Sequence, residues 1–440
     1  MTAAGPGVRG GILRPGRIPP KLPGRLSQLV HLPVGPAARS RWAAAWYGLF
    51  AVYAGIIAVV SAASYERTWG LWAVGAYAVA SLAALLWRSH GTAAAIGVSF
   101  AGALIGPLVW LSAKAPPTPD VLVVARSATL LLRHGNPYIS PEQLAHLPGH
   151  LGYNPYLPAM VLFGMPRALG LSGWVGDPRV WLAVATLVLL ILAFRIAGRR
   201  DAVRCSVLGM GSPIVAFPLA LGITDPPILA LACFALALLS RSMRPLSTWL
   251  PAAIAIGFGC AMKFTAWPAL PVLVALVATR DGARAAVKFT AAAVGTMAAL
   301  VAACAPAALS KPGTLFQNTV LFPLALTHAQ TPAASPLPGH LLANTGHAGH
   351  LAAVGLLVAA GLAVTVSLVI RPPKDAPAAA LRLAIGLAAL FALSPAARFG
   401  YFAYPAGLLG WIVLTRVPPE ADSQDMDRDR LPADHAEGPG

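Results

Sequence analysis

The feature that most constrains this chain is the succession of long apolar stretches between Trp42 and Arg416. Many of them approach the roughly 20 residues that a helix needs to cross the hydrocarbon core of a bilayer. Within that core a helix satisfies its own backbone hydrogen bonds. Because 57% of the residues are apolar and only 11% are charged, a soluble domain of 440 residues is excluded. The sequence therefore predicts an all-α, multi-pass membrane protein.

We predict about twelve transmembrane helices in one membrane domain, residues 42–416. The predicted spans are roughly 42–63, 69–87, 92–113, 178–196, 205–222, 226–240, 247–262, 266–279, 287–308, 349–370, 379–395 and 400–416. The N-terminal tail, 1–41, is basic and has no acid. The C-terminal tail, 417–440, is acidic and has the composition of a disordered segment.

The net charge of +17 raises the question of a nucleic-acid partner, but the basic residues are dispersed at the ends of apolar segments. They therefore indicate membrane orientation, and no nucleic acid is expected. A cytoplasmic N-terminal tail, followed by alternation, puts most of the 32 Lys and Arg residues on the cytoplasmic side. We expect a plasma-membrane protein with both termini in the cytoplasm. Its two long loops, 114–177 and 309–348, then lie on the outer face.

One apolar segment, residues 156–171, could be taken as a thirteenth span. It is short, it contains Pro158, Gly164, Pro166 and Arg167, and counting it as a span would move the next basic cluster to the outside. We therefore expect a helix that lies in or near the outer membrane interface.

Five carboxylates lie on the predicted outer face: Glu66, Asp120, Glu142, Asp177 and Asp225. Glu66 fits a solvated loop charge, while Glu142 and Asp177 occupy positions typical of helix starts. Asp225 stands in a very short turn, where it can cap a helix or face a pocket. Asp120 opens an amphipathic segment, 120–133, and is either its N-cap or a functional group.

The motif Asn-Pro-Tyr occurs twice in the first outer loop, at residues 136–138 and 154–156. We interpret both copies as turns at the corners of a pocket wall, with Tyr138 and Tyr156 anchored at the membrane interface. Histidines gather in or beside the two outer loops: His134, His146, His150, His328, His340, His347 and His350. The four cysteines fall inside apolar runs without paired spacing and indicate neither disulfides nor a zinc site.

Several of these segments resemble known membrane enzymes. The run from Asp120 through LLRHGNPY, followed by YNPYLPAMVLFGMPRALG, resembles the first outer loop of GT-C glycosyltransferases, in particular the actinobacterial type of glycosyltransferase family 87. GFGCAMKFTAWPALPVLVAL (257–276) and SPAARFGYFAYP are similar to further segments of that group. The resemblance covers most of residues 42–416 and implies a GT-C-like bundle with membrane-surface helices in the first outer loop.

The resemblance implies transfer of a monosaccharide, mannose by family analogy, from a polyprenyl-phosphate donor to a cell-envelope glycan or glycolipid. Asp120 would be the catalytic base, and the outer-edge cations would hold the phosphate. The predicted substrate-binding residues are Arg126, Arg133, His134, Tyr138, Tyr156, Asp225, Lys263 and Arg398. No nucleotide or other cofactor is expected. His347 and His350 have a spacing compatible with a divalent metal, but no acid lies near them in the sequence.

Three other functions remain open from the sequence. A twelve-span transporter or flippase would show two similar halves and charges at the membrane midplane, and neither is evident. A lipid-linked glycan polymerase or ligase would share the donor type and the outer face. A non-enzymatic membrane scaffold would need only the spans and the basic tail.

Overall fold

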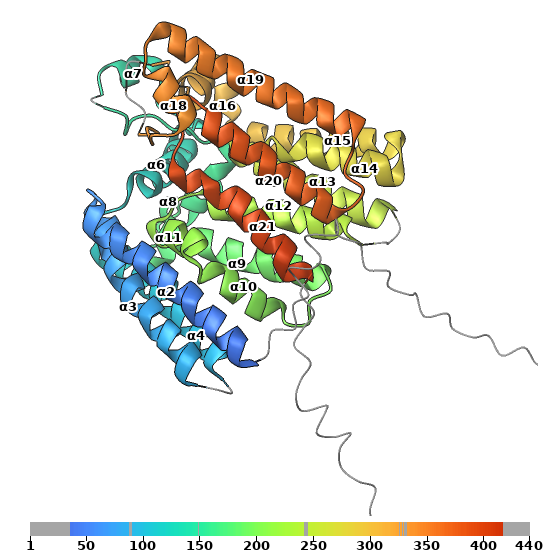
Figure 1. Ribbon diagram of the computed structural model, residues 1–440. Helices are drawn as coiled ribbons and strands as arrows, with labels where there is room; N and C mark the ends of the chain where they lie inside the picture. The colour runs from blue at the N-terminus through green and yellow to red at the C-terminus, as the bar shows by residue number, and fades with distance from the viewer. Residues whose placement is uncertain are drawn as a thin grey trace, which may run out of the picture.

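The computed structural model describes residues 36–416 except 88–89, 148, 242–244, 325, 328 and 330–331 (Figure 1). Over these residues the protein is helical, with one isolated parallel bridge between Ala334 and Ala397. Of the predicted tails, only residues 36–41 are described, and they begin the first helix instead of preceding it. The rest of 1–41, all of 417–440 and His328 lie outside the described residues.

Seven of the described helices are long and apolar enough to cross a membrane, or eight spans if one bent pair is counted as a single span. This confirms a multi-pass helical membrane protein. The seven are α2 (Pro36–Val60), α3 (Ser64–Leu86), α4 to α5 (Gly91–Phe100, the π-helix Ala101–Ile105 and Gly106–Lys114), α9 (Pro178–Ile196), α15 (Ala283–Cys304), α19 (His347–Ile370) and α20 (Ala376–Leu393).

The predicted count of about twelve spans is not confirmed within the described residues. The remaining predicted spans are shorter or bent helices: α10 (Ala202–Met210), α11 (Pro213–Leu221), α12 (Asp225–Leu239), α13 (Pro245–Met262), α14 (Ala269–Asp281) and α21 (Ala403–Arg416). The pair α10 and α11 is bent by 70°, where Pro213 cannot continue the preceding helix. The 15 residues of α12 reach about 22 Å, less than the roughly 30 Å of a hydrocarbon core. The bounds predicted for this helix, 226–240, agree with α12, but the structure does not confirm that so short a helix is a complete span.

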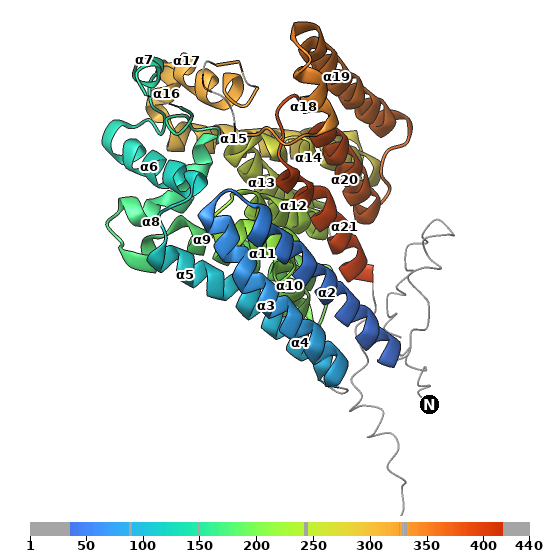
Figure 2. The same cartoon turned by 60° about the vertical axis from the view of Figure 1, so that its left-hand side comes forward.

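The short helix α12 lies inside the bundle, where most of its residues are buried. It packs against α9, α13 and α21. Helices α2, α3 and α4 flank the bundle on one side, and α19 lies on the opposite side (Figures 1 and 2). The short helices α7 (Pro141–Ala145), α16 (Pro306–Ser310), α17 (Pro312–Phe316) and α18 (Pro338–Ala343) gather at one end of the molecule (Figure 2).

The helix predicted to open at Asp120 is present as α6, Pro119–His134. Pro119 occupies the first turn, and Gly135 ends the helix in the left-handed conformation, with φ 66°. The N-cap residue is Thr118 and not Asp120, and the Thr118 hydroxyl donates to the Leu221 carbonyl at 2.8 Å. Asp120 stands one position inside the helix, so its carboxylate is available for other contacts.

The segment 156–171 does not form a thirteenth span. It folds into a 3-10 helix, η2 (Pro158–Gly164), and a single α-helical turn, α8 (Met165–Ala168), which together are too short to cross a membrane. Residues 158–161 are buried, and η2 contacts α6, α13 and α15. The segment therefore packs against α6 inside the protein. The prediction of a single helix along the membrane interface is wrong.

The two long loops that the sequence predicts to be outer loops are joined by hydrogen bonds around both Asn-Pro-Tyr motifs. In each motif the asparagine Oδ1 accepts from the tyrosine amide two residues later, at 3.1 Å for Asn136 and 3.0 Å for Asn154. The Asn318 side chain, from the second loop, accepts from the Asn154 amide and donates to the Ile139 carbonyl. Both motifs are therefore turns, as predicted, and Asn318 fixes them relative to each other.

The packing of η2 against α6, the helix that carries Asp120, can be tested through the stability of the protein. A Cβ added at Gly164 would overlap the Val124 carbonyl oxygen of α6, while its backbone conformation suits any residue. We expect Gly164→Ala to reduce the free energy of unfolding by about 1–3 kcal/mol through this overlap. Gly295→Ala, in α15 with no atom within 4 Å of the added Cβ, is the control and should be neutral or mildly stabilising. Thermal unfolding in detergent measures both variants, and equal effects would contradict the packing argument.

Candidate active site

A buried ion pair of Asp225 and Lys263 lies where α12, α13, α21 and the 3-10 helix η4 (Phe264–Ala266) meet. Asp225 begins α12, and Lys263 follows the last residue of α13. The Lys263 Nζ donates to Asp225 Oδ1 at 2.5 Å, and the side chains are only 11% and 5% exposed. The Tyr404 hydroxyl, from α21, donates to the same oxygen at 2.7 Å. Because the Tyr404 hydroxyl donates its one proton to Asp225, its oxygen accepts in the contact with Thr265. The Thr265 hydroxyl therefore donates to Tyr404 Oη at 2.7 Å.

Beside this pair lies a second, more open group of residues around Asp120. The Tyr156 hydroxyl donates to Asp120 Oδ1, and the Arg398 Nη1 lies 4.0 Å from Asp120 Oδ2. The side chain of Asp120 is 19% exposed and that of Arg398 is 35% exposed. Asp120 Oδ1 thus accepts from Tyr156, whereas Oδ2 faces Arg398 at more than hydrogen-bond distance, on a side chain that is partly exposed.

Aromatic rings connect the two groups. The Lys263 Nζ lies 5.6 Å from the ring centre of Tyr156 and 5.2 Å from that of Tyr401, so it makes cation–π contacts with both. We call the seven residues Asp120, Tyr156, Asp225, Lys263, Arg398, Tyr401 and Tyr404 the polar cluster.

The surroundings of Lys263 and Tyr156 keep these two donors protonated. Burial acts to lower the pKa of Lys263, but the Asp225 carboxylate and further neighbours outweigh it, and the net pKa is raised. Burial, followed by the charge of Asp120, raises the pKa of the Tyr156 hydroxyl well above its usual value. Lys263 therefore stays an ammonium, and Tyr156 stays a hydrogen-bond donor to Asp120.

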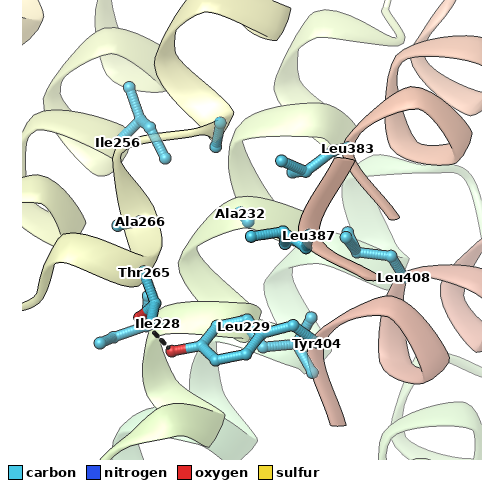
Figure 3. Close-up of a pocket in the computed structure, with 11 residues that line it drawn as sticks. Ile228, Leu229, Ala232, Ile256, Thr265, Ala266, Leu383, Leu387, Tyr404 and Leu408 are labelled. Carbon is cyan, nitrogen blue, oxygen red and sulfur yellow. Dashed lines mark hydrogen bonds between the residues drawn. The ribbon is translucent and has the colours of Figure 1, made fainter. Parts of the chain in front are cut away.

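An apolar pocket adjoins the polar cluster at Tyr404 and Thr265, whose hydroxyls are drawn in contact in Figure 3. Its other walls come from helices α12, α13, α14, α20 and α21. The labelled apolar lining residues include Ile228, Leu229, Leu383, Leu387 and Leu408 (Figure 3). The hydrogen-bonded hydroxyls of Tyr404 and Thr265 therefore lie directly beside an apolar pocket.

Four of the residues predicted to bind substrate are not part of the polar cluster. Arg126 donates to the backbone carbonyls of Leu151 and Gly152 at 2.6 and 2.9 Å. Arg133 and His134 are exposed at the end of α6. Tyr138 is 4% exposed, and its hydroxyl donates to the Tyr156 carbonyl at 2.9 Å. Tyr138 and Tyr156 are both buried, so the prediction that they anchor at the membrane interface is wrong.

The contacts of Arg126 favour a structural role, and this can be tested. Arg126→Gln removes two charged donors, one from the exposed Leu151 carbonyl and one from the partly buried Gly152 carbonyl, so we expect the free energy of unfolding to fall by about 1–3 kcal/mol. The Michaelis constant for the sugar donor should stay unchanged. Arg133→Gln makes the same charge change on an exposed position of the same helix and should leave the melting temperature as it is. A raised donor KM in Arg126→Gln with an unchanged melting temperature would instead place Arg126 on the substrate.

Tyr401 and Tyr404 were missed in the sequence. Both stand in the segment SPAARFGYFAYP beside Arg398, where tyrosines at the start of an apolar run are typical of interface anchors. Tyr401 and Tyr404 are three residues apart, on either side of the start of α21. This spacing places two side chains on one side of a helix, and it was the signal available in the sequence.

Two further carboxylates of the described residues stand at helix starts. Glu142 is exposed in the first turn of α7, and Asp177 caps α9 by accepting from the Arg179 amide at 2.9 Å, as their positions predicted. Among the described residues, no three His, Cys, Asp or Glu side chains form a group that could hold a metal ion. The four cysteines are free and buried.

The bundle defines a multi-pass membrane protein, and its sequence places it in a known family of enzymes. The sequence pattern of glycosyltransferase family 87 matches residues 154–395, more than half of the chain, and the protein belongs to that family. It is therefore a membrane glycosyltransferase. No curated protein and no solved structure gives a significant match. Tyr156, Asp225 and Lys263 lie within the matched range, whereas Asp120, Arg398, Tyr401 and Tyr404 lie outside it.

Proposed function

We propose that this glycosyltransferase moves a monosaccharide, with mannose as the expected sugar, from a polyprenyl-phosphate donor to a cell-envelope glycan or glycolipid. The observation that carries the proposal is the contact of Asp120 with Tyr156 and Arg398 beside an apolar pocket. The members of the polar cluster come from the outer ends of their segments in the predicted topology, so the reaction takes place on the outer face of the plasma membrane.

In this proposal Asp120 acts as the base for the acceptor. The acceptor oxygen forms a bond to the anomeric carbon, and the bond from that carbon to the phosphate oxygen breaks. The proton of the acceptor hydroxyl passes to Asp120 Oδ2, while the electron pair of the broken bond leaves on the phosphate. Because positive charge develops at the anomeric carbon, the attacking hydroxyl becomes more acidic as the bond forms. A carboxylate that already accepts from Tyr156 therefore remains an adequate base.

Arg398 is the cation assigned to the phosphate. Lys263 is held by Asp225 at 2.5 Å and is nearly inaccessible, whereas Arg398 is one-third exposed and 4.0 Å from its carboxylate. The phosphodiester of a polyprenyl-phosphate sugar carries one negative charge. A single loosely paired guanidinium suits that charge better than it suits a diphosphate, and it can follow the phosphate as charge develops there.

The apolar pocket supports a lipid-linked donor. Its leucine and isoleucine side chains lie next to Tyr404 and Thr265, and the space between them has room for about one water molecule. An isoprene unit beside the polar cluster therefore requires these side chains to move apart when the donor binds. A water-soluble nucleotide sugar would leave this apolar surface unused.

The proposal is tested with purified protein in proteoliposomes. We expect sugar transfer from labelled polyprenyl-phosphate mannose and none from a nucleotide-linked mannose. Transfer of a whole oligosaccharide from a polyprenyl diphosphate would replace the proposal by a polymerase or ligase activity. Transfer from the nucleotide sugar alone would refute a lipid donor.

A further inference from the structure

Arg398 lies in a connection between α20 and α21 that is clamped by a segment of the second outer loop. Residues 394–398 of this connection are irregular, residues 399–402 form the 3-10 helix η6 (Phe399–Phe402), and Arg398 itself is extended, with φ −120° and ψ 145°. A connection of this kind has many conformations when nothing holds it, and ordering each backbone residue costs about 1–2 kcal/mol. The orientation of Arg398 therefore depends on what the connection contacts.

Ser335 bonds to the residues on both sides of Arg398. The Ser335 amide donates to the Ala397 carbonyl at 3.0 Å, and the Phe399 amide donates to Ser335 Oγ at 3.1 Å. The preceding residue, Ala334, forms the isolated parallel bridge with Ala397. Ser335 thus fixes the backbone before and after Arg398 and leaves the guanidinium directed toward Asp120.

Two more residues of the same segment hold the beginning of the connection. His340 Nδ1 donates to the Pro395 carbonyl at 2.8 Å, because a carbonyl oxygen can only accept. Gly339 packs directly on the backbone of Leu393 and Ser394, where an added Cβ would overlap the Leu393 carbonyl. We call residues 334–340 the strap.

We propose that the strap positions Arg398 for the phosphate of the donor, with Ser335 as the positioning residue. This inference rests on the proposed function, which assigns Arg398 to the phosphate. A cation held in place before the donor arrives loses less conformational freedom on binding, so the strap lowers the donor KM. Ser335 touches neither reactant and acts only through Arg398.

The first test measures the strap without any activity. Deuterium uptake of the peptide around residues 396–402 is followed by mass spectrometry in lipid nanodiscs. We expect faster uptake in Ser335→Ala, which removes the acceptor of the Phe399 amide, and parent-like uptake in Ser335→Thr, which keeps the hydroxyl. Ser310→Ala is the matched control, since the Ser310 hydroxyl bonds only within its own turn. Unchanged uptake in Ser335→Ala would overturn the strap.

The second test uses transfer kinetics in the four variants of a double-mutant cycle. Ser335→Ala should raise the donor KM about fivefold, as expected for one lost hydrogen bond, and leave the acceptor KM unchanged. In an Arg398→Gln background the same change should matter less than about twofold, because the group it positions is gone. An equal factor in both backgrounds, or a joint shift of both KM values, would show a merely structural role and overturn the inference.

The two tests separate the strap from the proposed function. A parent protein that transfers nothing from polyprenyl-phosphate sugars refutes the proposed function and the donor role of the strap together. Deuterium uptake still shows in that case whether Ser335 holds the backbone around Arg398. An active parent with no kinetic coupling between Ser335 and Arg398 refutes the inference alone.

Discussion

Asp120→Asn is expected to lower kcat for sugar transfer by about 10²–10⁴-fold, the range typical for the loss of a general base. Asparagine has nearly the same shape and keeps an oxygen for the Tyr156 hydroxyl, but it cannot take up the acceptor proton. The variant also removes the negative charge beside Arg398, so the donor KM should stay the same or fall. A loss confined to kcat would identify Asp120 as a group that acts in the transition state.

The control for this prediction is Glu142→Gln. It neutralises an exposed carboxylate in α7, within the same long loop and outside the polar cluster. Initial rates in proteoliposomes, normalised to the amount of folded protein, should match those of the parent. A rate for Asp120→Asn within about twofold of the parent would remove Asp120 as the base.

Asp225→Asn is expected to reduce the free energy of unfolding by about 3–5 kcal/mol, because it leaves the buried Lys263 ammonium without a charged partner. Tyr404 also loses its strong acceptor. The double variant Asp225→Asn with Lys263→Met should recover part of the loss, since it removes the unpaired charge. Melting temperatures of the two single variants and the double variant give the coupling between the residues.

A matched ion pair elsewhere in the protein provides the control for Asp225. Asp201 pairs with Arg199 at 2.6 Å but is 28% exposed. Water can replace part of that contact, so Asp201→Asn should be clearly less destabilising. Equal losses at both positions, or additive effects of Asp225→Asn and Lys263→Met, would contradict the view that the Asp225–Lys263 pair organises the polar cluster.

The membrane character and the position of most helices could be predicted from the sequence, because burial in lipid requires long apolar runs. Cap chemistry was also readable: Asp177 is the N-cap of α9, and Ser140 is the N-cap of α7, as the residue types indicate. The number of membrane spans was not readable. The bounds predicted for α12 agree with the structure, but apolar composition does not distinguish a short helix buried in the bundle from one that crosses the bilayer.

The residues of the polar cluster were only partly predictable. Lys263 stood out because a charge beside an apolar segment is expensive, and the family resemblance singled out Asp120, Tyr156, Asp225 and Arg398. Their pairing could not be read, since Asp225 and Tyr404 are 179 residues apart in the chain. Arg126 has the same charge as Arg398 and was predicted alike, yet backbone carbonyls occupy it. Sequence chemistry thus found the charged residues, and tertiary contacts decided which of them meet.

Sugar transfer in sealed membrane vesicles of known orientation tests the central proposal most directly. Right-side-out and inside-out membrane vesicles carrying the parent or Asp120→Asn are given labelled polyprenyl-phosphate mannose and a water-soluble acceptor that cannot cross the membrane. We expect the parent to label the acceptor in right-side-out vesicles only, and Asp120→Asn to label it in neither. Labelling in inside-out vesicles, or labelling by Asp120→Asn at the parent rate, would contradict an outer-face reaction at this polar cluster.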